Sequence, residues 1–219
     1  MGEGVKGKSS GRRGYTSPRR AEHAAATRRA ILAAARELFV ANGYSPTTVA
    51  DIARLSGVAV DTIYATVGRK PAVLRELVET ALSGTQQAVP AEQRDYVGRI
   101  SAAGSALDKI TIYAHAITEI QQRLAPIYLA LRDAASSDAD CSALCGEISE
   151  RRAANMRMFA RDLRSTGDLR DDLSDEQIAD IAWSMNGSEY WVLLVDERKW
   201  SAGQFQDWLV DAWSRLLLK

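Results

Sequence analysis

The sequence has only two histidines and two cysteines among its 219 residues. Metal centres and nucleophile–base pairs draw heavily on these side chains, so we expect no enzymatic activity, no metal site and no cofactor. Cys141 and Cys145 are four residues apart, which places both thiols on one face of a helix. Two thiols do not make a zinc site unless His115 or an acid joins them. We expect reduced side chains, with a redox switch as the alternative.

Long apolar runs are also missing. The longest candidate, YWVLLV at 190–195, is far shorter than the roughly 20 residues that a membrane-spanning helix needs. The N-terminus is basic but has no apolar stretch of the signal-peptide kind. We therefore expect a cytoplasmic protein without a membrane partner.

Neither sign of charge is in excess, because 28 Lys and Arg balance 28 Asp and Glu. The distribution is uneven, however. Residues 1–80 hold 13 basic and 7 acidic side chains (13 − 7 = +6), and the remainder hold 15 and 21 (15 − 21 = −6). A basic head on an acidic body favours binding to a polyanion through the head. Chance asymmetry with a solvated tail is the alternative.

The segment from Thr47 to Lys70, TTVADIARLSGVAVDTIYATVGRK, has the pattern of two short helices joined by a tight turn. Ala53 is small enough for the helices to cross closely, and Gly57 suits a turn with positive φ. Ile63 points back into a small core. This spacing indicates a helix–turn–helix, and an ordinary helical hairpin is the alternative.

Helical patterns lie on both sides of this segment. Between Thr27 and Tyr44 the apolar residues recur on one face, and Asn42-Gly43 supplies a stop. Pro71 starts another helix downstream. The local prediction is a three-helix head followed by a connecting helix.

This region resembles the TetR family of bacterial transcriptional regulators. The resemblance covers residues 27–80 and is carried by Gly43-Tyr44, Thr47-Thr48, Ile52-Ala53, Gly57-Val58, Thr62-Ile63-Tyr64 and Lys70. Val67-Gly68-Arg69 departs from the pattern, since many members carry a phenylalanine and different small residues there. The resemblance implies a homodimeric repressor that binds a double-stranded DNA operator and is released by a small-molecule effector.

The recognition helix is expected at 59–66. Its candidates for contact with base edges are Ala59, Val60, Asp61, Thr62, Ala65 and Thr66. None is Arg, Asn or Gln, so specificity should depend on thymine methyl contacts, threonine hydroxyls and DNA shape. Asp61 could accept from a cytosine amino group or only complement the helix N-terminus.

Four further residues are candidates for contact with DNA phosphates. Thr48 is placed to cap the second helix, with Asp51 completing a capping pair. The resemblance implies phosphate contacts from Thr47, Thr48, Tyr64 and Lys70. A buried aromatic side chain is the alternative for Tyr64.

Residues 1–26 are predicted to form a flexible basic arm. Gly2 to Ser9, GEGVKGKS, matches the phosphate-binding loop formula, but no strand precedes it and no helical pattern follows it. Nucleotide hydrolysis is therefore not expected. The arm could follow DNA phosphates or only increase solubility.

The predicted fold class is all-α. The DNA-binding domain is assigned to 27–72, and a larger helical domain for effector binding and dimerisation to 73–219. Helices are expected at 71–87, 91–101, 104–122, 124–136, 139–165, 174–186, 188–197 and 202–217.

All five tryptophans fall in the last 37 residues, and the final helix carries a wide apolar stripe. Large aromatics with leucine are typical of a buried dimer interface, although core packing would also use them. The family's use of its last two long helices for dimerisation favours an interface that contains Trp191, Phe205, Trp208, Leu209, Trp213 and Leu216.

An effector cavity between the body helices is the last prediction. Its candidate lining combines apolar side chains with a few polar groups, although each could instead fill the core. The candidates are Tyr113, His115, Ile117, Ile120, Tyr128, Met156, Met158, Phe159, Trp183, Asn186 and Tyr190. A helical adaptor protein whose head contacts protein, not DNA, is the alternative function.

Overall fold

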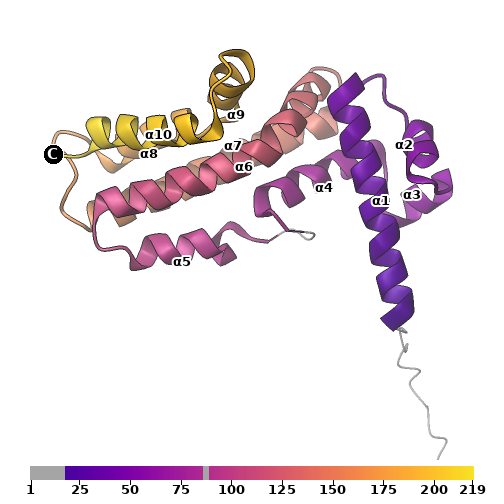
Figure 1. Cartoon of the computed structure of the whole chain (residues 1–219), viewed down its shortest axis with the longest axis horizontal. Helices are drawn as coiled ribbons and strands as arrows, with labels where there is room; N and C mark the ends of the chain where they lie inside the picture. Colours follow the sequence, from indigo (N-terminus) through magenta and orange to yellow (C-terminus); the bar gives the residue numbers. More distant parts are fainter. Residues whose placement is uncertain (1–17, 86–88) are drawn as a thin grey trace, which may run out of the picture.

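The computed structural model describes residues 18–85 and 89–219 (Figure 1). This part of the chain forms ten α-helices and no strand, which confirms the all-α prediction. The phosphate-loop match and the first 17 residues of the predicted arm lie outside the described residues. The helices are α1 (Pro18–Asn42), α2 (Val49–Ser56), α3 (Val60–Thr66), α4 (Lys70–Ser83), α5 (Asp95–Ala102), α6 (Ala106–Ala135), α7 (Ala139–Arg164), α8 (Asp175–Met185), α9 (Ser188–Trp191) and α10 (Ala202–Leu217).

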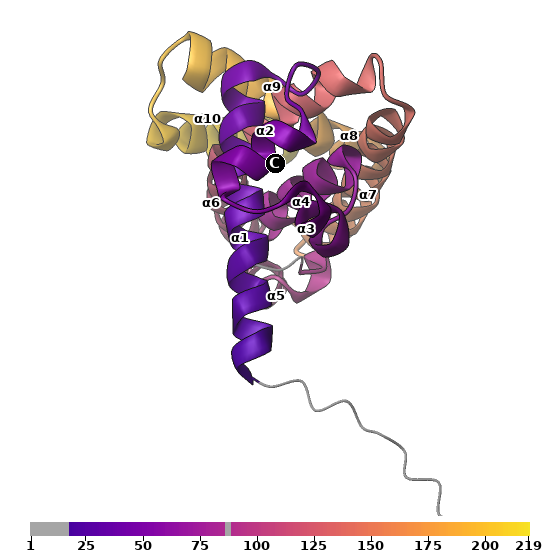
Figure 2. The same ribbon diagram turned by 90° about the vertical axis from the view of Figure 1, so that its right-hand side faces the viewer.

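The head and the body are separate parts of one elongated molecule. Helices α1, α2 and α3 form the head at one end, and α4 leads from it into the body (Figure 1). In the body α6 runs lengthwise and packs against α4, α5, α7 and α10, while α8 packs on α7. Seen from the head side, α1 stands in front of the body with α2 and α3 beside it (Figure 2).

Several helix ends are encoded by short local signals. Ser174 and Gln177 form a capping box at the start of α8, and Ser201 and Gln204 form the same motif at α10. Each pair satisfies two backbone N–H groups that the first turn would otherwise leave unpaired. The predicted start of the last helix at 202 is therefore confirmed.

Two predicted boundaries differ from the structure. Helix α1 begins at Pro18, so residues 18–26 are its first turns and not part of a flexible arm. Proline is tolerated in a first helical turn because its missing N–H would have no helical partner there. The predicted break at Pro126 is wrong, because α6 continues through it. The neighbouring Leu124, Ala125 and Ile127 are buried, and their packing outweighs the lost hydrogen bond.

The predicted helix at 188–197 is confirmed in position, but it begins as an α-helix and continues as a π-helix. After α9 the residues from Val192 to Glu197 form a π-helical turn (η2), with the Arg198 N–H donating to the Leu193 carbonyl at 3.1 Å. Likewise, the predicted helix at 91–101 is a 3₁₀ turn, η1 (Ala91–Gln93), followed by α5.

One continuous hydrophobic core runs from the head into the body through α4. Val73, Leu74, Leu77 and Val78 of this helix are buried, and α4 packs against α1, α6 and α7. The predicted domain boundary at 72/73 therefore falls inside a helix that both parts share. Each described helix is too short or too polar to cross a membrane.

Candidate functional site

The head contains the expected helix–turn–helix. Thr48 caps α2, with its Oγ1 accepting from the Asp51 N–H at 3.1 Å, while Asp51 Oδ2 accepts from the Thr48 N–H at 3.0 Å. Gly57 ends α2 at φ +70°, the left-handed conformation that favours glycine. Ala53 and Ile63 are buried where α2 and α3 meet. The structure therefore confirms the predicted capping pair of Thr48 and Asp51, the glycine turn at Gly57 and the buried anchor at Ile63.

Helix α3 has one face on the head core and one face open to solvent. Ile63 is fully buried, whereas Ala59, Asp61 and Ala65 are exposed and Tyr64 is 49% exposed. The alternative of a buried Tyr64 is therefore excluded. Val60, Thr62 and Thr66 are partly exposed at the edges of this face. We call the side chains of Ala59, Val60, Asp61, Thr62, Tyr64, Ala65 and Thr66 the recognition face.

Thr47 and Lys70 have internal roles that differ from the predicted phosphate contacts. Thr47 is 3% exposed, and its hydroxyl donates to the Gly43 carbonyl at 2.8 Å. The Lys70 ammonium donates to the carbonyls of Tyr44 at 2.9 Å and Thr47 at 3.0 Å. Desolvation by burial lowers the pKa of Lys70. Both side chains hold the loop between α1 and α2, because its carbonyls have no helical partner.

Arg69 is a candidate phosphate contact that sequence reasoning missed. It is exposed at the N-cap of α4, and its side chain has no hydrogen bond or ion pair within the described ranges. Nearby Arg54, in contrast, pairs with Asp51 at 2.6 Å, and Arg28 donates to the Thr66 carbonyl at 2.7 Å. The sequence contained a signal, since Arg69 stands two residues before Pro71, where the fourth helix was expected to start.

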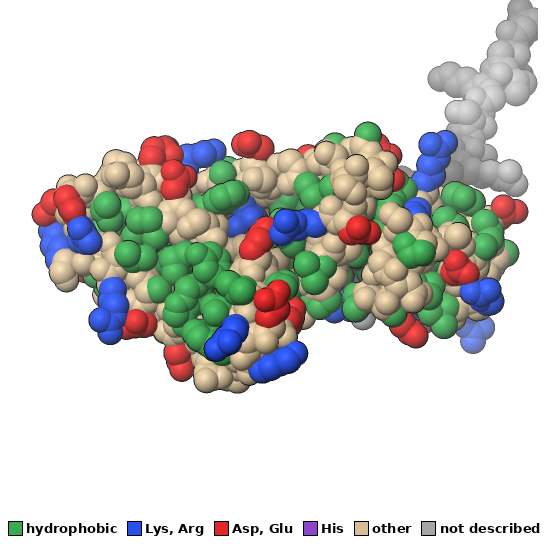
Figure 3. All heavy atoms as spheres, turned by 90° about the horizontal axis from the view of Figure 1, so that it is seen from above, with side chains coloured by type: hydrophobic (Ala, Val, Ile, Leu, Met, Phe, Trp, Pro, Cys, Tyr) green, Lys and Arg blue, Asp and Glu red, His purple; other side chains and the backbone are tan. Residues whose placement is uncertain are grey.

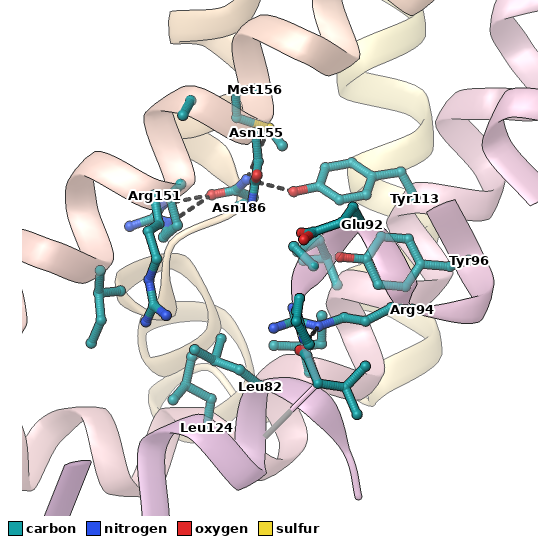
Figure 4. Close-up of a pocket in the computed structure, with 18 of the residues that line it drawn as sticks. Leu82, Glu92, Arg94, Tyr96, Tyr113, Leu124, Arg151, Asn155, Met156 and Asn186 are labelled. Atoms are coloured by element: carbon teal, nitrogen blue, oxygen red, sulfur yellow. Dashed lines mark hydrogen bonds between the residues drawn. The ribbon is translucent and has the colours of Figure 1, made fainter. Parts of the chain in front are cut away.

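A cavity of about 470 Å³ lies in the body between α4, α6 and α7 (Figure 4). Its floor is apolar, with Leu82, Ile117 and Leu124 among the lining residues. Polar side chains enter from η1 and from α7. A second lobe of about 280 Å³ shares Tyr96, Tyr113 and Met156 with it and continues toward α5. The sizes are typical of small-molecule sites.

Seven of the eleven predicted residues line the two lobes of the cavity. Tyr113, Ile117, Ile120, Met156 and Asn186 line the larger lobe, and Met158 and Phe159 line the second.

The other four predicted residues lie elsewhere. His115 is exposed, with Nδ1 3.1 Å from Gln206 Oε1, and Tyr128 donates to Glu189 at 3.0 Å. Trp183 lies under the Arg152 guanidinium, and Tyr190 packs on Trp208. Helical periodicity predicts only roughly which face of a helix a residue occupies. The prediction therefore included residues of α6, α8 and α9 that point away from the cavity.

A polar network forms one wall of the cavity. Arg152 Nη2 donates to Asn186 Oδ1 at 2.6 Å and to the Trp183 carbonyl at 2.8 Å. Asn186 Nδ2 donates in turn to the Tyr113 hydroxyl at 2.8 Å. Burial raises the pKa of Tyr113, so the hydroxyl stays neutral. These bonds hold the side chains of the wall in place.

The predicted dimer residues divide into core and surface. Phe205, Leu209 and Trp213 are 0% exposed and Trp191 is 5% exposed within the single chain, so they belong to its core. A side chain without free surface has no area left to bury against a partner. Trp208 and Leu216 remain accessible. Figure 3 shows the molecule from above, with apolar side chains gathered on this face.

Neither cysteine is in a disulfide. Burial raises the pKa of both thiols, and the Tyr44 hydroxyl and Asp138 lie beside Cys141. A raised pKa reduces the thiolate fraction and with it the reactivity. No group of three or more His, Cys, Asp and Glu within 18–85 and 89–219 is arranged to hold a metal ion.

Residues 31–77 match the family described as bacterial regulatory proteins, tetR family. The N-terminal domain is a TetR-family domain. The matched residues contain α2, the turn and α3, so this domain is a helix–turn–helix DNA-binding domain. No curated protein matches the chain.

Solved structures extend the likeness to the TetR fold from the head to most of the chain. A protein assigned as a transcriptional regulator from Saccharomonospora viridis, with choline bound, is 18% identical at a TM-score of 0.65, with 88% of this chain and 97% of that chain covered. A protein assigned to the TetR family from Syntrophomonas wolfei is 16% identical at 0.67 and covers 87% and 94%. The MbdR regulator from Azoarcus sp. CIB is 19% identical at 0.65 and covers 85% and 96%. At these identities the likeness is one of fold.

Proposed function

We propose that this protein is a homodimeric TetR-type repressor that binds an operator in duplex DNA and leaves it when a small molecule fills the body cavity. The observation that carries the proposal is the recognition face on α3, which is open to solvent on a family-matched helix–turn–helix. A groove-reading helix needs one buried anchoring side and one free side, as α3 has.

The free side of α3 suits shape and methyl readout. It offers threonine hydroxyls, small apolar groups and the Tyr64 phenol, and no long side chain with paired donors. Arg69 and Tyr64 are the proposed phosphate contacts, and Thr48 contributes a hydroxyl at the start of α2. Thr47 and Lys70 position the loop that presents them.

Dimerisation is proposed to use the apolar patch over α9 and α10. We define this patch as Tyr190 of α9, Leu193 of η2, and Trp208 and Leu216 of α10, of which Leu193 is 48% and Leu216 is 41% exposed. A two-fold dimer would place two α3 helices on major-groove faces roughly 34–36 Å apart.

Helix α4 is the proposed link between the cavity and the head. Its Glu79 lines the cavity and pairs with Arg151 of α7 at 2.6 Å. Arg123 of α6 donates to the Ala81 carbonyl at 3.0 Å, at the same C-terminal end of α4. A ligand that changes these contacts would shift α4, whose first residue, Lys70, holds the α1–α2 loop.

Fluorescence anisotropy with labelled duplexes from the chain's own upstream DNA tests this function. We expect nanomolar to micromolar binding that weakens steeply with salt, and for Tyr64→Phe a loss shared by all sequences. A head that binds no duplex at low ionic strength would leave the protein-binding adaptor as the better account.

A further inference from the structure

The cavity holds two arginines whose charge is not balanced by a carboxylate. Of the three arginines that line it, Arg151 is paired with Glu79. Arg94 and Arg152 form no ion pair with any residue of 18–85 or 89–219. Partly buried charges of this kind are usually paired, and an unpaired one in a cavity indicates a charged ligand.

The two terminal nitrogens of the Arg94 guanidinium face the cavity without a hydrogen-bond partner among the described residues. Its Nε donates to the Val89 carbonyl at 3.2 Å, and this bond restrains the orientation of the guanidinium. Its two terminal nitrogens have no partner in the described part of the chain, and Figure 4 shows the side chain reaching into the cavity. A planar pair of free N–H donors matches the two oxygens of a carboxylate.

The other unpartnered polar groups nearby agree with an anionic head group. The Tyr96 hydroxyl and the Asn155 amide line the cavity and have no hydrogen-bond partner among the described residues. Both can donate. Two acids line the larger lobe. Glu79 is paired with Arg151, and Glu92, which is exposed and lines both lobes, is the opposing charge without an ion pair among the described residues. Arg94 and Arg152 outnumber it.

The lining of the second lobe indicates that the rest of the ligand is apolar. Val97, Ile100, Met158 and Phe159 line it. Of its two acids, Asp162 is paired with Lys109 at 2.9 Å, and Glu92 is shared with the larger lobe. This lobe therefore favours an unbranched or aromatic apolar group continuing from the charged one.

We infer that the cavity binds an amphipathic carboxylate, with the carboxylate on Arg94 and the apolar tail in the lobe beside α5. The inference rests on the proposal that the cavity holds a small-molecule ligand. Arg152, whose Nη1 has no partner, adds a second cation at the polar end.

Three probes with one tail and different heads test the assignment: decanoate, decanol and decyltrimethylammonium, each titrated calorimetrically into the full chain below its micelle concentration. We expect saturable binding of decanoate, one per chain, and at least tenfold weaker binding of the other two. Arg94→Gln should weaken decanoate at least tenfold, and Arg94→Lys should recover part of the loss because it keeps the charge but not the fork. Arg99→Gln is the matched control, since Arg99 is exposed on α5 and lines neither lobe.

The inference is overturned if decanoate does not saturate, if Arg94→Gln binds it normally, or if the ammonium binds better and loses affinity in Glu92→Gln. The titration contains no DNA, so its outcome is independent of the operator assay. Decanoate bound by a protein that never binds duplex would contradict the proposed function alone. Duplex binding without decanoate binding would contradict the carboxylate assignment alone.

Discussion

The ammonium of Lys70 lies 3.9 Å from the centre of the Tyr44 ring and donates to the Tyr44 carbonyl. This contact joins the first residue of α4 to the loop before α2. Tyr44 in turn donates through its hydroxyl to Asp138 at 3.1 Å, at the start of α7. One aromatic side chain therefore contacts the head, the connecting helix and the body.

Lys70→Ala should destabilise the head. It leaves the Tyr44 and Thr47 carbonyls without their donor and removes the cation–π contact, at a cost of about 1–2 kcal/mol in unfolding free energy. Urea denaturation followed by circular dichroism measures this. Arg69→Ala is the matched control next to it, because that side chain has no partner among the described residues.

In the DNA-binding assay we expect the effect of Arg69→Ala on binding, not its effect on stability, to distinguish this residue from Lys70. Arg69→Ala should keep the wild-type unfolding free energy but flatten the salt dependence of duplex binding by about one unit of slope. A wild-type slope in Arg69→Ala would remove this residue from the phosphate contacts.

Gly57→Ala and Gly146→Ala should have opposite signs. Gly57 has φ +70° with open space around its Cβ position, so an added methyl brings strain without a clash and should cost about 1 kcal/mol. Gly146 is inside α7, also in open space, and alanine there should stabilise by roughly 0.5–1 kcal/mol. Thermal unfolding of the two variants measures both. If both substitutions changed the stability equally, the positive φ assigned to Gly57 in the turn would be contradicted.

If the chain forms the proposed dimer, Trp208→Arg should dissociate it without unfolding the chain. Trp208 is partly exposed in the apolar patch, and a charge there would be buried against the partner. Native mass spectrometry at micromolar concentration should show monomer, whereas Val40→Arg, an exposed apolar position on α1, should remain dimeric. Trp213→Ala should instead lower stability by about 3–5 kcal/mol, because that ring is fully buried.

Asp138→Ala should lose stability in a pH-dependent way. Hydrogen bonds from the Cys141 N–H and from the Tyr44 hydroxyl lower the pKa of Asp138 in the folded state. Stability from a carboxylate with a depressed pKa is complete above the unfolded value of about 3.9 and is lost as pH falls through the folded value. The variant should be about 1 kcal/mol less stable at neutral pH, from the lost helix cap, with the gap narrowing below about pH 4.

Chemical denaturation across this pH range measures the gap. Asp133→Ala is the control at the end of α6, because its carboxylate accepts no hydrogen bond from residues 18–85 or 89–219, and its stability should change by less than about 0.5 kcal/mol. A gap for Asp138→Ala that grows on acidification would contradict the sign of the pKa shift.

The head could be predicted from the sequence because its signals are local. Thr48 with Asp51, Gly57 and Ile63 each act within one or two helical turns, and the structure places all of them as expected. The role of Lys70 could not be predicted in this way. Its partners are 23 and 26 residues earlier, and whether an ammonium reaches carbonyls or phosphate depends on tertiary packing.

The cavity and the dimer surface were predicted less well for a related reason. Apolar residues at helical spacing identify a buried face without saying whether it faces the core or another chain, so Phe205 and Trp213 were placed at an interface. The cavity prediction chose mainly apolar and aromatic side chains, with His115 and Asn186 as polar members, and it missed Arg94 and Asn155. Charged and amide side chains are usually exposed to solvent, so only the tertiary structure shows that Arg94 and Asn155 line a cavity.

Fluorescence anisotropy with duplex DNA across a salt series tests the central claim most directly, using the wild-type chain and Thr62→Asp, which adds a negative charge to the recognition face. The account predicts saturable binding by the wild type, weakened steeply by salt, and at least a hundredfold lower affinity for the variant. Equal affinity for the two proteins, or no binding of duplex at low ionic strength, would contradict it.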